Sequence, residues 1–141
     1  MSWYIAALRK YAVFRGRARR KEYWIFQLIL YTFFLGGLLL YPLFERLPAS
    51  VEEQFGDIYL LILYTYFAAM LLPGLAVTIR RLHDTGRSGW WYLISLVPYI
   101  GEFVLLIFLL QDSQYGDNKY GPNPKDMEES RQWRSQPNMG V

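Results

Sequence analysis

Long runs of apolar residues, rather than alternating apolar and polar residues, dominate the pattern of this chain. Residues 23–44, YWIFQLILYTFFLGGLLLYPLF, and residues 58–79, IYLLILYTYFAAMLLPGLAVTI, contain no charged residue. A helix needs about 20 residues to cross the hydrocarbon core of a membrane. Each run therefore predicts a transmembrane helix. A removable signal peptide is a poor alternative for the first run, because the apolar core of such a peptide is shorter.

A third apolar run covers residues 90–110, WWYLISLVPYIGEFVLLIFLL, and contains one charged residue, Glu102, and one proline, Pro98. Membrane helices tolerate proline where neighbours satisfy the freed carbonyl group, so we expect one span kinked near Pro98. The alternative is a shallow hairpin that bends at Pro98–Gly101, with arms too short to cross. A single span puts the tail on the opposite side of the membrane from residues 80–89, whereas a hairpin returns it to the same side.

The residues before the first run predict an amphipathic helix. Its apolar residues recur at helical spacing on one face, and they are Trp3, Tyr4, Ala7, Leu8 and Tyr11. We expect this helix to lie in the headgroup layer, and the alternative is that its apolar face packs on the protein's own spans. The predicted fold is thus an all-α membrane protein with an interfacial N-terminal helix and three transmembrane helices. These form one domain, residues 1–125, and the polar residues 126–141 are predicted to be disordered.

Composition and charge indicate the cellular compartment of the protein and its orientation in the membrane. The 141 residues are 53% hydrophobic and 18% aromatic and include no cysteine, which excludes disulfides, thiolate metal sites and a cysteine nucleophile. Lys and Arg crowd residues 1–22 and 80–89, whereas residues 45–57 are mainly acidic. Short loops rich in Lys and Arg stay in the cytoplasm. We therefore expect the N-terminus and the 80–89 loop inside, and the 45–57 loop and the tail after Leu110 outside.

The loop RRLHDTGRSGWW, residues 80–91, contains the one histidine of the chain. His83 and Asp84 are weak candidates for acid–base catalysis, because side chains adjacent in sequence point apart. One histidine with scattered carboxylates is also too little for a typical zinc site. Anion recognition has more support, since arginine binds phosphate with two prongs and Ser88 can cap a helix whose amides face the headgroups. The candidate anion- or lipid-binding residues are Arg17, Arg20, Arg80, Arg81, Arg87 and Ser88.

A structural interpretation competes with anion binding. The basic segment before the first span and the 80–89 loop are both predicted on the cytoplasmic face, so they can meet. Glu22 or Asp84 would then pair with an arginine of the other segment and form a clasp. The arginines are otherwise free to hold a phosphate.

Glu102 is a separate candidate, because an ionisable residue near the middle of a predicted span is costly and is by default functional. The open roles are a proton-linked step, a dimer contact, or placement in a water-filled dip beside Pro98. The predicted spans contain no second charge, so a transport relay lacks a partner.

Four tracts together resemble a known family. They are YAVFRGRARRKEYW (11–24), PGLAVTIRRLHDTGRSGWW (73–91), SLVPYIGEFVLLIFLLQDSQ (95–114) and GDNKYGPNP (116–124). In this order they resemble the bacterial domain of unknown function 805 family. The resemblance implies a polytopic bacterial inner-membrane protein, and it carries over no catalytic residue, because the activity of the family is not established. Glu102 departs from the family pattern, which expects an apolar or aromatic residue there.

The expected function is a non-enzymatic membrane subunit or adaptor. It would bind anionic lipid headgroups or a membrane partner through a cytoplasmic Arg-rich face. One rival is an enzyme acting on a lipid-linked phosphate, with His83 and Asp84 as acid or base. The other is a small transporter or channel subunit that uses Glu102. We expect membrane lipids and a second copy or another membrane protein as partners, and no nucleic acid, cofactor or metal.

Overall fold

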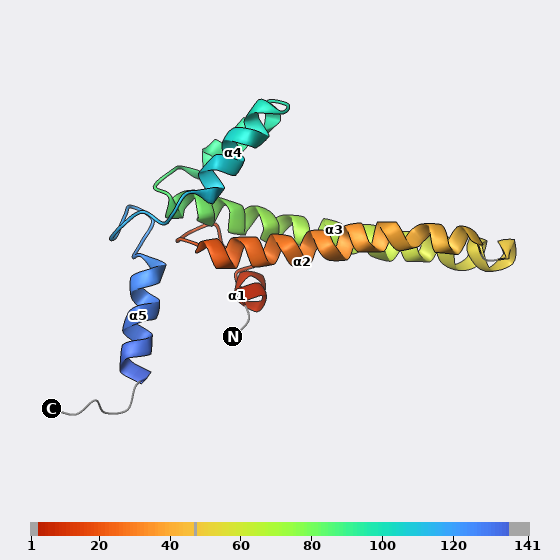
Figure 1. Ribbon diagram of the computed structural model, residues 1–141, viewed down its shortest axis with the longest axis horizontal. Helices are drawn as coiled ribbons and strands as arrows, with labels where there is room; N and C mark the ends of the chain where they lie inside the picture. Colours follow the sequence, from red (N-terminus) through yellow and green to blue (C-terminus); the bar gives the residue numbers. More distant parts are fainter. Residues whose placement is uncertain (1–2, 47, 136–141) are drawn as a thin grey trace.

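Two long antiparallel helices form the body of the protein (Figure 1). The computed structural model describes residues 3–46 and 48–135, and this part of the chain is helical without a β-strand. Helix α2 (Arg20–Leu40) is joined to α3 (Ala49–Asp84) by the 3-10 helix η1 (Tyr41–Arg46). The segments Arg20–Leu43 and Phe55–Asp84 are long and apolar enough to cross a membrane. They coincide with the first two predicted spans.

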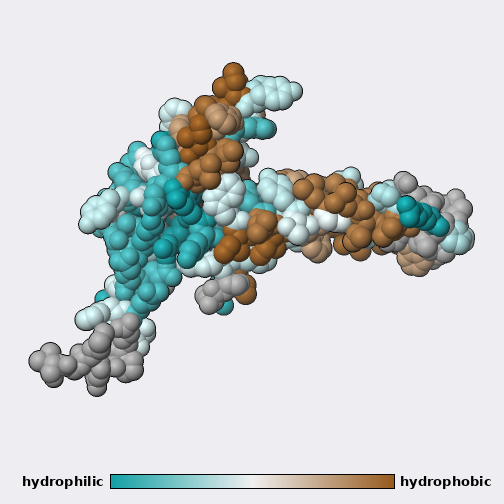
Figure 2. Space-filling model, in the orientation of Figure 1, coloured by the Kyte–Doolittle hydropathy of each residue, from teal (hydrophilic) through white to brown (hydrophobic). Residues whose placement is uncertain are grey.

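The outer faces of α2 and α3 are apolar and exposed. Leu28 is 68% exposed, Leu39 79% and Leu61 66%. In Figure 2 the hydrophobic surface covers the helix pair and the hairpin that stands beside it, while the hydrophilic surface gathers at one end. A water-soluble protein of this size buries such faces, because large exposed apolar patches associate with other surfaces. These faces are therefore suited to contact with lipid.

Helix α1 (Trp3–Arg9) packs on the helix pair. Ala7 is fully buried, and the ring of Tyr4 stacks on Phe26 with 5.5 Å between the ring centroids. The Tyr4 hydroxyl also lies 3.4 Å from that of Tyr66 in α3. The apolar face of this helix thus rests on the protein itself, as the alternative interpretation stated, rather than on the headgroup layer.

The third apolar run is a hairpin. The 3-10 helix η2 (Gly89–Leu96) and helix α4 (Ile100–Leu110) pack against each other, and the chain reverses between them. The hairpin stands at an angle to α2 and α3 (Figure 1). The expectation of one kinked span is therefore wrong for this structure, and the hairpin alternative describes it.

Local backbone chemistry explains the reversal. Pro98 has no N–H to donate, and Tyr99 has a φ of 62°, in the left-handed region that ends a continuous right-handed helix. Gly101 lies so close to the backbone of η2 that a Cβ atom would be 1.7 Å from the carbonyl oxygen of Ile94. Only glycine allows this approach. These residues together produce a turn where the sequence analysis expected a kink.

The hairpin brings the tail back to the end of the helix pair where α2 begins and α3 finishes. Segment 111–123 crosses this end and leads into helix α5 (Pro124–Ser135). The tail after Leu110 thus lies at the same end as the N-terminal basic segment, contrary to the single-span prediction. Helix α5 also differs from the expected disorder after residue 125, and residues 136–141 of that prediction lie outside the described residues.

Asn123 starts α5 locally. Its side-chain oxygen accepts a hydrogen bond from the backbone N–H of Lys125 at 3.1 Å. An asparagine in this position satisfies an amide that the first turn of a helix leaves unpaired. The helix therefore has a defined beginning despite its polar sequence.

Candidate functional site

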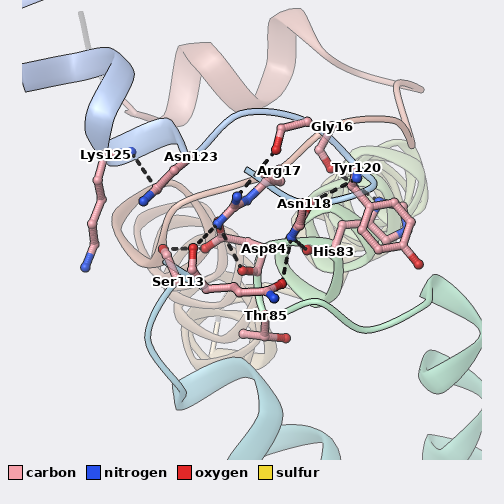
Figure 3. A network of polar contacts seen from close by, with 12 residues as sticks. Gly16, Arg17, His83, Asp84, Thr85, Ser113, Asn118, Tyr120, Asn123 and Lys125 are labelled. Carbon is pink, nitrogen blue, oxygen red and sulfur yellow. Dashed lines mark hydrogen bonds and ion pairs between the residues drawn. The ribbon is translucent and has the colours of Figure 1, made fainter. Parts of the chain in front are cut away.

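Three arginines and two carboxylates are buried together at the end of the helix pair. Arg17 precedes α2 and Glu22 lies in its first turn, while Arg80, Arg81 and Asp84 lie at the end of α3. Figure 3 shows part of this set, with Arg17 and Asp84 at its centre. Burying a guanidinium is costly unless its charge and its N–H groups are paired. We call these five residues the arginine network.

Arg17 uses all five of its N–H groups inside the protein. Its Nε donates to Asp84 Oδ1 at 2.9 Å. Nη1 donates to the carbonyl oxygens of Gly116 at 2.7 Å and Gly121 at 3.4 Å. Nη2 donates to the carbonyl oxygens of Gln114 at 2.6 Å and Asp84 at 3.4 Å. A guanidinium has five donors, so none remains for a phosphate group.

Asp84 joins the three segments of the network. Its Oδ2 accepts hydrogen bonds from Arg81 Nη1 and, at 2.6 Å, from the Ser113 hydroxyl. The backbone N–H of Gln114 donates to the Asp84 carbonyl at 2.9 Å. Arg81 in turn donates from Nε to the carbonyl of Leu109 at 3.2 Å, at the end of α4. The carboxylate is therefore the point at which the basic entry, α3 and the tail meet.

Arg80 and Glu22 form the second pair between the two basic segments. Arg80 Nη1 donates to Glu22 Oε1 at 2.6 Å, and both side chains are buried. The backbone N–H of Ala18 also donates to the Arg80 carbonyl at 3.0 Å. Within the described residues, Arg80 Nη2 is buried without a hydrogen-bond partner. Both carboxylates named for a clasp, Glu22 and Asp84, thus bind an arginine of the opposite segment.

His83 and Asp84 do not form a catalytic pair. The His83 Nδ1 lies 3.2 Å from the carbonyl oxygen of Gly16, and its ring stacks on Tyr120 with 3.7 Å between centroids. The Asp84 oxygens bind Arg17, Arg81 and Ser113 instead. In the described part of the chain no hydrogen bond joins the two side chains. The geometry therefore gives the acid–base interpretation no support.

The remaining candidates for anion binding have different surroundings. The Arg20 side chain is 44% exposed. Its Nε donates to the Gln111 carbonyl at 2.8 Å and lies 4.0 Å from Asp112 Oδ1 in an exposed ion pair. Arg87 lies over the ring of Phe108, 4.0 Å from its centroid, and is half-buried. Ser88 caps η2 by accepting from the N–H of Trp90 at 3.4 Å. Of the predicted set, Arg20 alone keeps an exposed charge, while Arg17, Arg80 and Arg81 are enclosed.

Other cations near this end are exposed. Lys10, Arg15 and Lys21 are exposed, as is Arg20. Lys10 lies close to Arg17, because both line the same cavity between α1 and α5. We call these four exposed side chains the cationic rim. Of these four residues, Arg20 alone belongs to the candidate anion-binding residues predicted from the sequence.

The tail adds a further charge pair outside the rim. Lys125 Nζ lies 2.6 Å from Asp112 Oδ1. The hydrogen bond from this ammonium lowers the pKa of the Asp112 carboxyl. Both side chains are largely exposed, so this pair contributes little to stability.

Glu102 does not lie in the middle of a span. It occupies the first turn of α4, near the tip of the hairpin, and its side chain is exposed. It lines a cavity of about 370 Å³ together with Tyr23 of α2 and Thr78 of α3. The lining extends from Tyr23 in the first turn of α2 to Tyr31, and from Thr78 to Phe67 in α3. Because the third apolar run folds as a hairpin, Glu102 lies near a turn instead of near the middle of one span.

The sequence analysis missed the contribution of the tail. Ser113 and Gln114 bind Asp84, and Asn118 Nδ2 donates to the His83 carbonyl at 2.9 Å. These residues lie in the QDSQ and GDNKYGPNP tracts, so their motif character was visible. No role was assigned because the single-span topology put them on the other side of the membrane.

The apolar helix pair and the enclosed charges at one end define a helical membrane protein whose motif residues bind one another. A comparison with family models identifies the particular group. The chain belongs to the family described as "Protein of unknown function (DUF805)", whose model matches residues 11–122. The resemblance found in the four sequence tracts is thereby confirmed.

Two relatives that are named as inner membrane proteins come from Escherichia coli. The chain is 44% identical to inner membrane protein YhaH over 127 residues, which cover 89% of this chain and 98% of the relative. It is also 44% identical to inner membrane protein YhaI over 125 residues, with 89% and 97% covered. An uncharacterized E. coli protein, YiiR, is 28% identical over 139 residues. No solved structure matches the chain.

Proposed function

We propose that the chain is a multi-pass inner-membrane protein that works as a non-enzymatic subunit or adaptor. Its N-terminus faces the cytoplasm, and the cationic rim binds anionic lipid headgroups or a membrane partner. The two E. coli relatives are named as inner membrane proteins, which supports this location. The orientation rests on the basic segments, which favour the cytoplasmic side.

One observation carries the proposal. The motif residues that looked most like a phosphate site are enclosed, and the Arg17 donors all have protein acceptors. Chemistry or ligand binding at the network would require this set of bonds to open. The exposed positive charge at the same end includes Lys10, Arg15, Arg20 and Lys21. Binding is therefore proposed for the rim, and a structural role for the network.

Electrostatic attraction to anionic lipids determines how strongly the rim binds a membrane surface. Each Lys or Arg near an anionic membrane surface contributes about 1 kcal/mol of attraction. The four rim cations together are enough to select anionic over zwitterionic headgroups next to the protein. The same charges suit an acidic surface on a partner protein.

Native mass spectrometry of the detergent-extracted protein tests the proposal. The test variant carries Arg15→Gln and Lys21→Gln. We expect it to retain less phosphatidylglycerol than the wild type, because two of the four rim charges are gone. The control carries Arg46→Gln and Arg134→Gln, which remove the same net charge from exposed positions outside the rim.

The two variants separate a local site from general charge. Equal loss of phosphatidylglycerol in both variants, or no loss in either, contradicts lipid binding at the rim. The same spectra give the number of chains in each particle, so a second copy as the partner is read out at the same time.

A further inference from the structure

The cavity beside Glu102 is lined by residues that do not belong to the arginine network. It lies between α2, α3 and the hairpin and has a volume of about 370 Å³, which is within the range of pockets for small ligands. Its polar lining residues, here called the polar wall, are Tyr23, Gln27, Tyr31, Thr78, Tyr92, Ser95 and Glu102. The rest is mainly apolar and includes Leu30, Phe67, Met70 and Leu105.

The polar wall is rich in acceptors. The Thr78 hydroxyl donates its hydrogen to the Gly74 carbonyl at 2.7 Å, and the Ser95 hydroxyl donates to the Tyr92 carbonyl at 2.8 Å. A hydroxyl has one hydrogen and two lone pairs. Toward the cavity, both oxygens are therefore left as acceptors.

Gln27 and Glu102 add further acceptors. Gln27 Oε1 is buried and has no hydrogen-bond partner in the described part of the chain, while its Nε2 donates to the Tyr23 hydroxyl at 3.3 Å. No ion pair or hydrogen bond of the Glu102 carboxyl occurs with any of the described residues 3–46 and 48–135. The described lining contains no Lys or Arg. A buried acceptor without a donor is costly. The lining offers hydroxyl donors from Tyr23, Tyr31 and Tyr92, but no positive charge.

The surroundings identify the rest of the ligand. The hairpin and the helix pair expose apolar side chains here: Leu71 lines the cavity and is exposed, as is Phe103, which follows Glu102 in the chain. In a membrane these surfaces face acyl chains. A ligand with an alkyl chain can keep the chain in that layer and place its head in the cavity.

We propose that this cavity binds the protonated amine of an amphiphile. The ammonium group supplies up to three N–H donors and one positive charge, which match the acceptors of the wall and the Glu102 carboxylate. The amine belongs either to the ethanolamine headgroup of a membrane lipid or to a free long-chain amine. The site is independent of the cationic rim, which has the opposite charge preference.

Binding of two matched probes to the purified full-length chain in nonionic detergent tests the site. The probes are dodecylamine and dodecanol, which share a chain and differ in the head, and native mass spectrometry counts the bound molecules. We expect the wild type to bind the amine about tenfold more tightly than the alcohol, the difference typical of a hydrogen-bonded charge.

A pair of isosteric variants assigns the preference to the cavity. Glu102→Gln removes the charge from an exposed side chain and is expected to abolish the tenfold preference without unfolding the protein. Glu129→Gln makes the same change on exposed α5 and is expected to keep it. An absent preference in the wild type, or an unchanged one in Glu102→Gln, overturns the proposal.

A lipid arm distinguishes the two sources of the amine. Phosphatidylethanolamine has N–H donors, whereas the quaternary ammonium of phosphatidylcholine has none. If the wild type retains phosphatidylethanolamine in preference to phosphatidylcholine and Glu102→Gln loses this preference, the lipid is the ligand. A Glu102-dependent preference for dodecylamine without such lipid selection names a free amine.

Discussion

At the scale of single residues, Arg17 and Arg15 show how differently two arginines of one motif are used. Arg17 is buried, and its five donors meet one carboxylate oxygen and four carbonyl oxygens. Arg15 is exposed. The planar fork of a guanidinium matches such a set of fixed acceptors, whereas a lysine ammonium offers three donors from a single point. The two positions therefore differ in what a conservative substitution does.

Arg17→Lys is predicted to destabilise the protein by about 3 kcal/mol, because breaking a buried charged network leaves acceptors and part of a charge unpaired. Arg15→Lys is predicted to have almost no effect. The free energy of unfolding, measured by SDS titration of the protein in mixed micelles, compares the two. Equal stability of both variants would show that the five bonds of Arg17 contribute little.

Part of this residue-level arrangement is readable from the sequence. Glu22 and Asp84 stand out as acids within basic segments, and the pairing of those segments follows from their common side of the membrane. The remaining acceptors of Arg17 are the backbone carbonyls of Asp84, Gln114, Gly116 and Gly121, and every residue has such a group. Sequence alone therefore cannot tell a satisfied arginine from a free one.

At the scale of elements, the hairpin of η2 and α4 is the main departure from the hydropathy pattern. An apolar run of this length fits both a single span and two short arms, since each buries the same kind of side chain. The choice depends on the backbone near Tyr99 and on the contact between Gly101 and Ile94. The long runs in α2 and α3 have no such break near the middle of the predicted span, and each lies in a helix long and apolar enough to cross a membrane.

Gly101→Ala tests the hairpin directly. The added Cβ would lie 1.7 Å from the Ile94 carbonyl oxygen, so the arms must separate. We expect a loss of about 3 kcal/mol in the free energy of unfolding, at the upper end for overpacking. Gly36→Ala is the control, because a Cβ at Gly36 meets no atom within 4 Å.

The Gly36→Ala control is needed to interpret the stability of Gly101→Ala. Alanine is the better helix former, so Gly36→Ala is expected to be neutral or slightly stabilising. If Gly101→Ala behaves in the same way, the two arms do not pack as described and the run is a continuous helix.

At the scale of the whole molecule, the hairpin and the arginine network together decide which side of the membrane the tail occupies. The tail binds Arg17 and Asp84 through segment 111–123, so it lies at the end where α2 begins. The N-terminal basic segment lies at the same end. Both ends of the chain are therefore expected on one side.

Fusions to the C-terminus check this arrangement. A C-terminal green fluorescent protein is expected to fluoresce, and a C-terminal alkaline phosphatase to be inactive, as for a cytoplasmic location. The same reporters after η1, in the loop between α2 and α3, are expected to give the opposite result. An active phosphatase at the C-terminus would restore the single-span topology.

The arrangement of the whole molecule determines which surfaces are available to binding partners. Its arginine network is enclosed, whereas its outer surface includes the apolar helix faces, the cationic rim and the cavity at Glu102. Family membership follows from the motifs, but the division between inward and outward charges requires the fold. Binding partners are therefore to be sought at the rim and at the cavity.

The central claim is that the buried charges bind each other, and a double-mutant cycle on Glu22 and Arg80 tests it most directly. Glu22→Leu and Arg80→Met are each expected to cost about 3 kcal/mol, because each leaves a buried charge alone. The double variant removes both charges, so the account predicts that it is at least about 2 kcal/mol more stable than the sum of the single changes. Additivity within about 0.5 kcal/mol, the behaviour of independent sites, would contradict it.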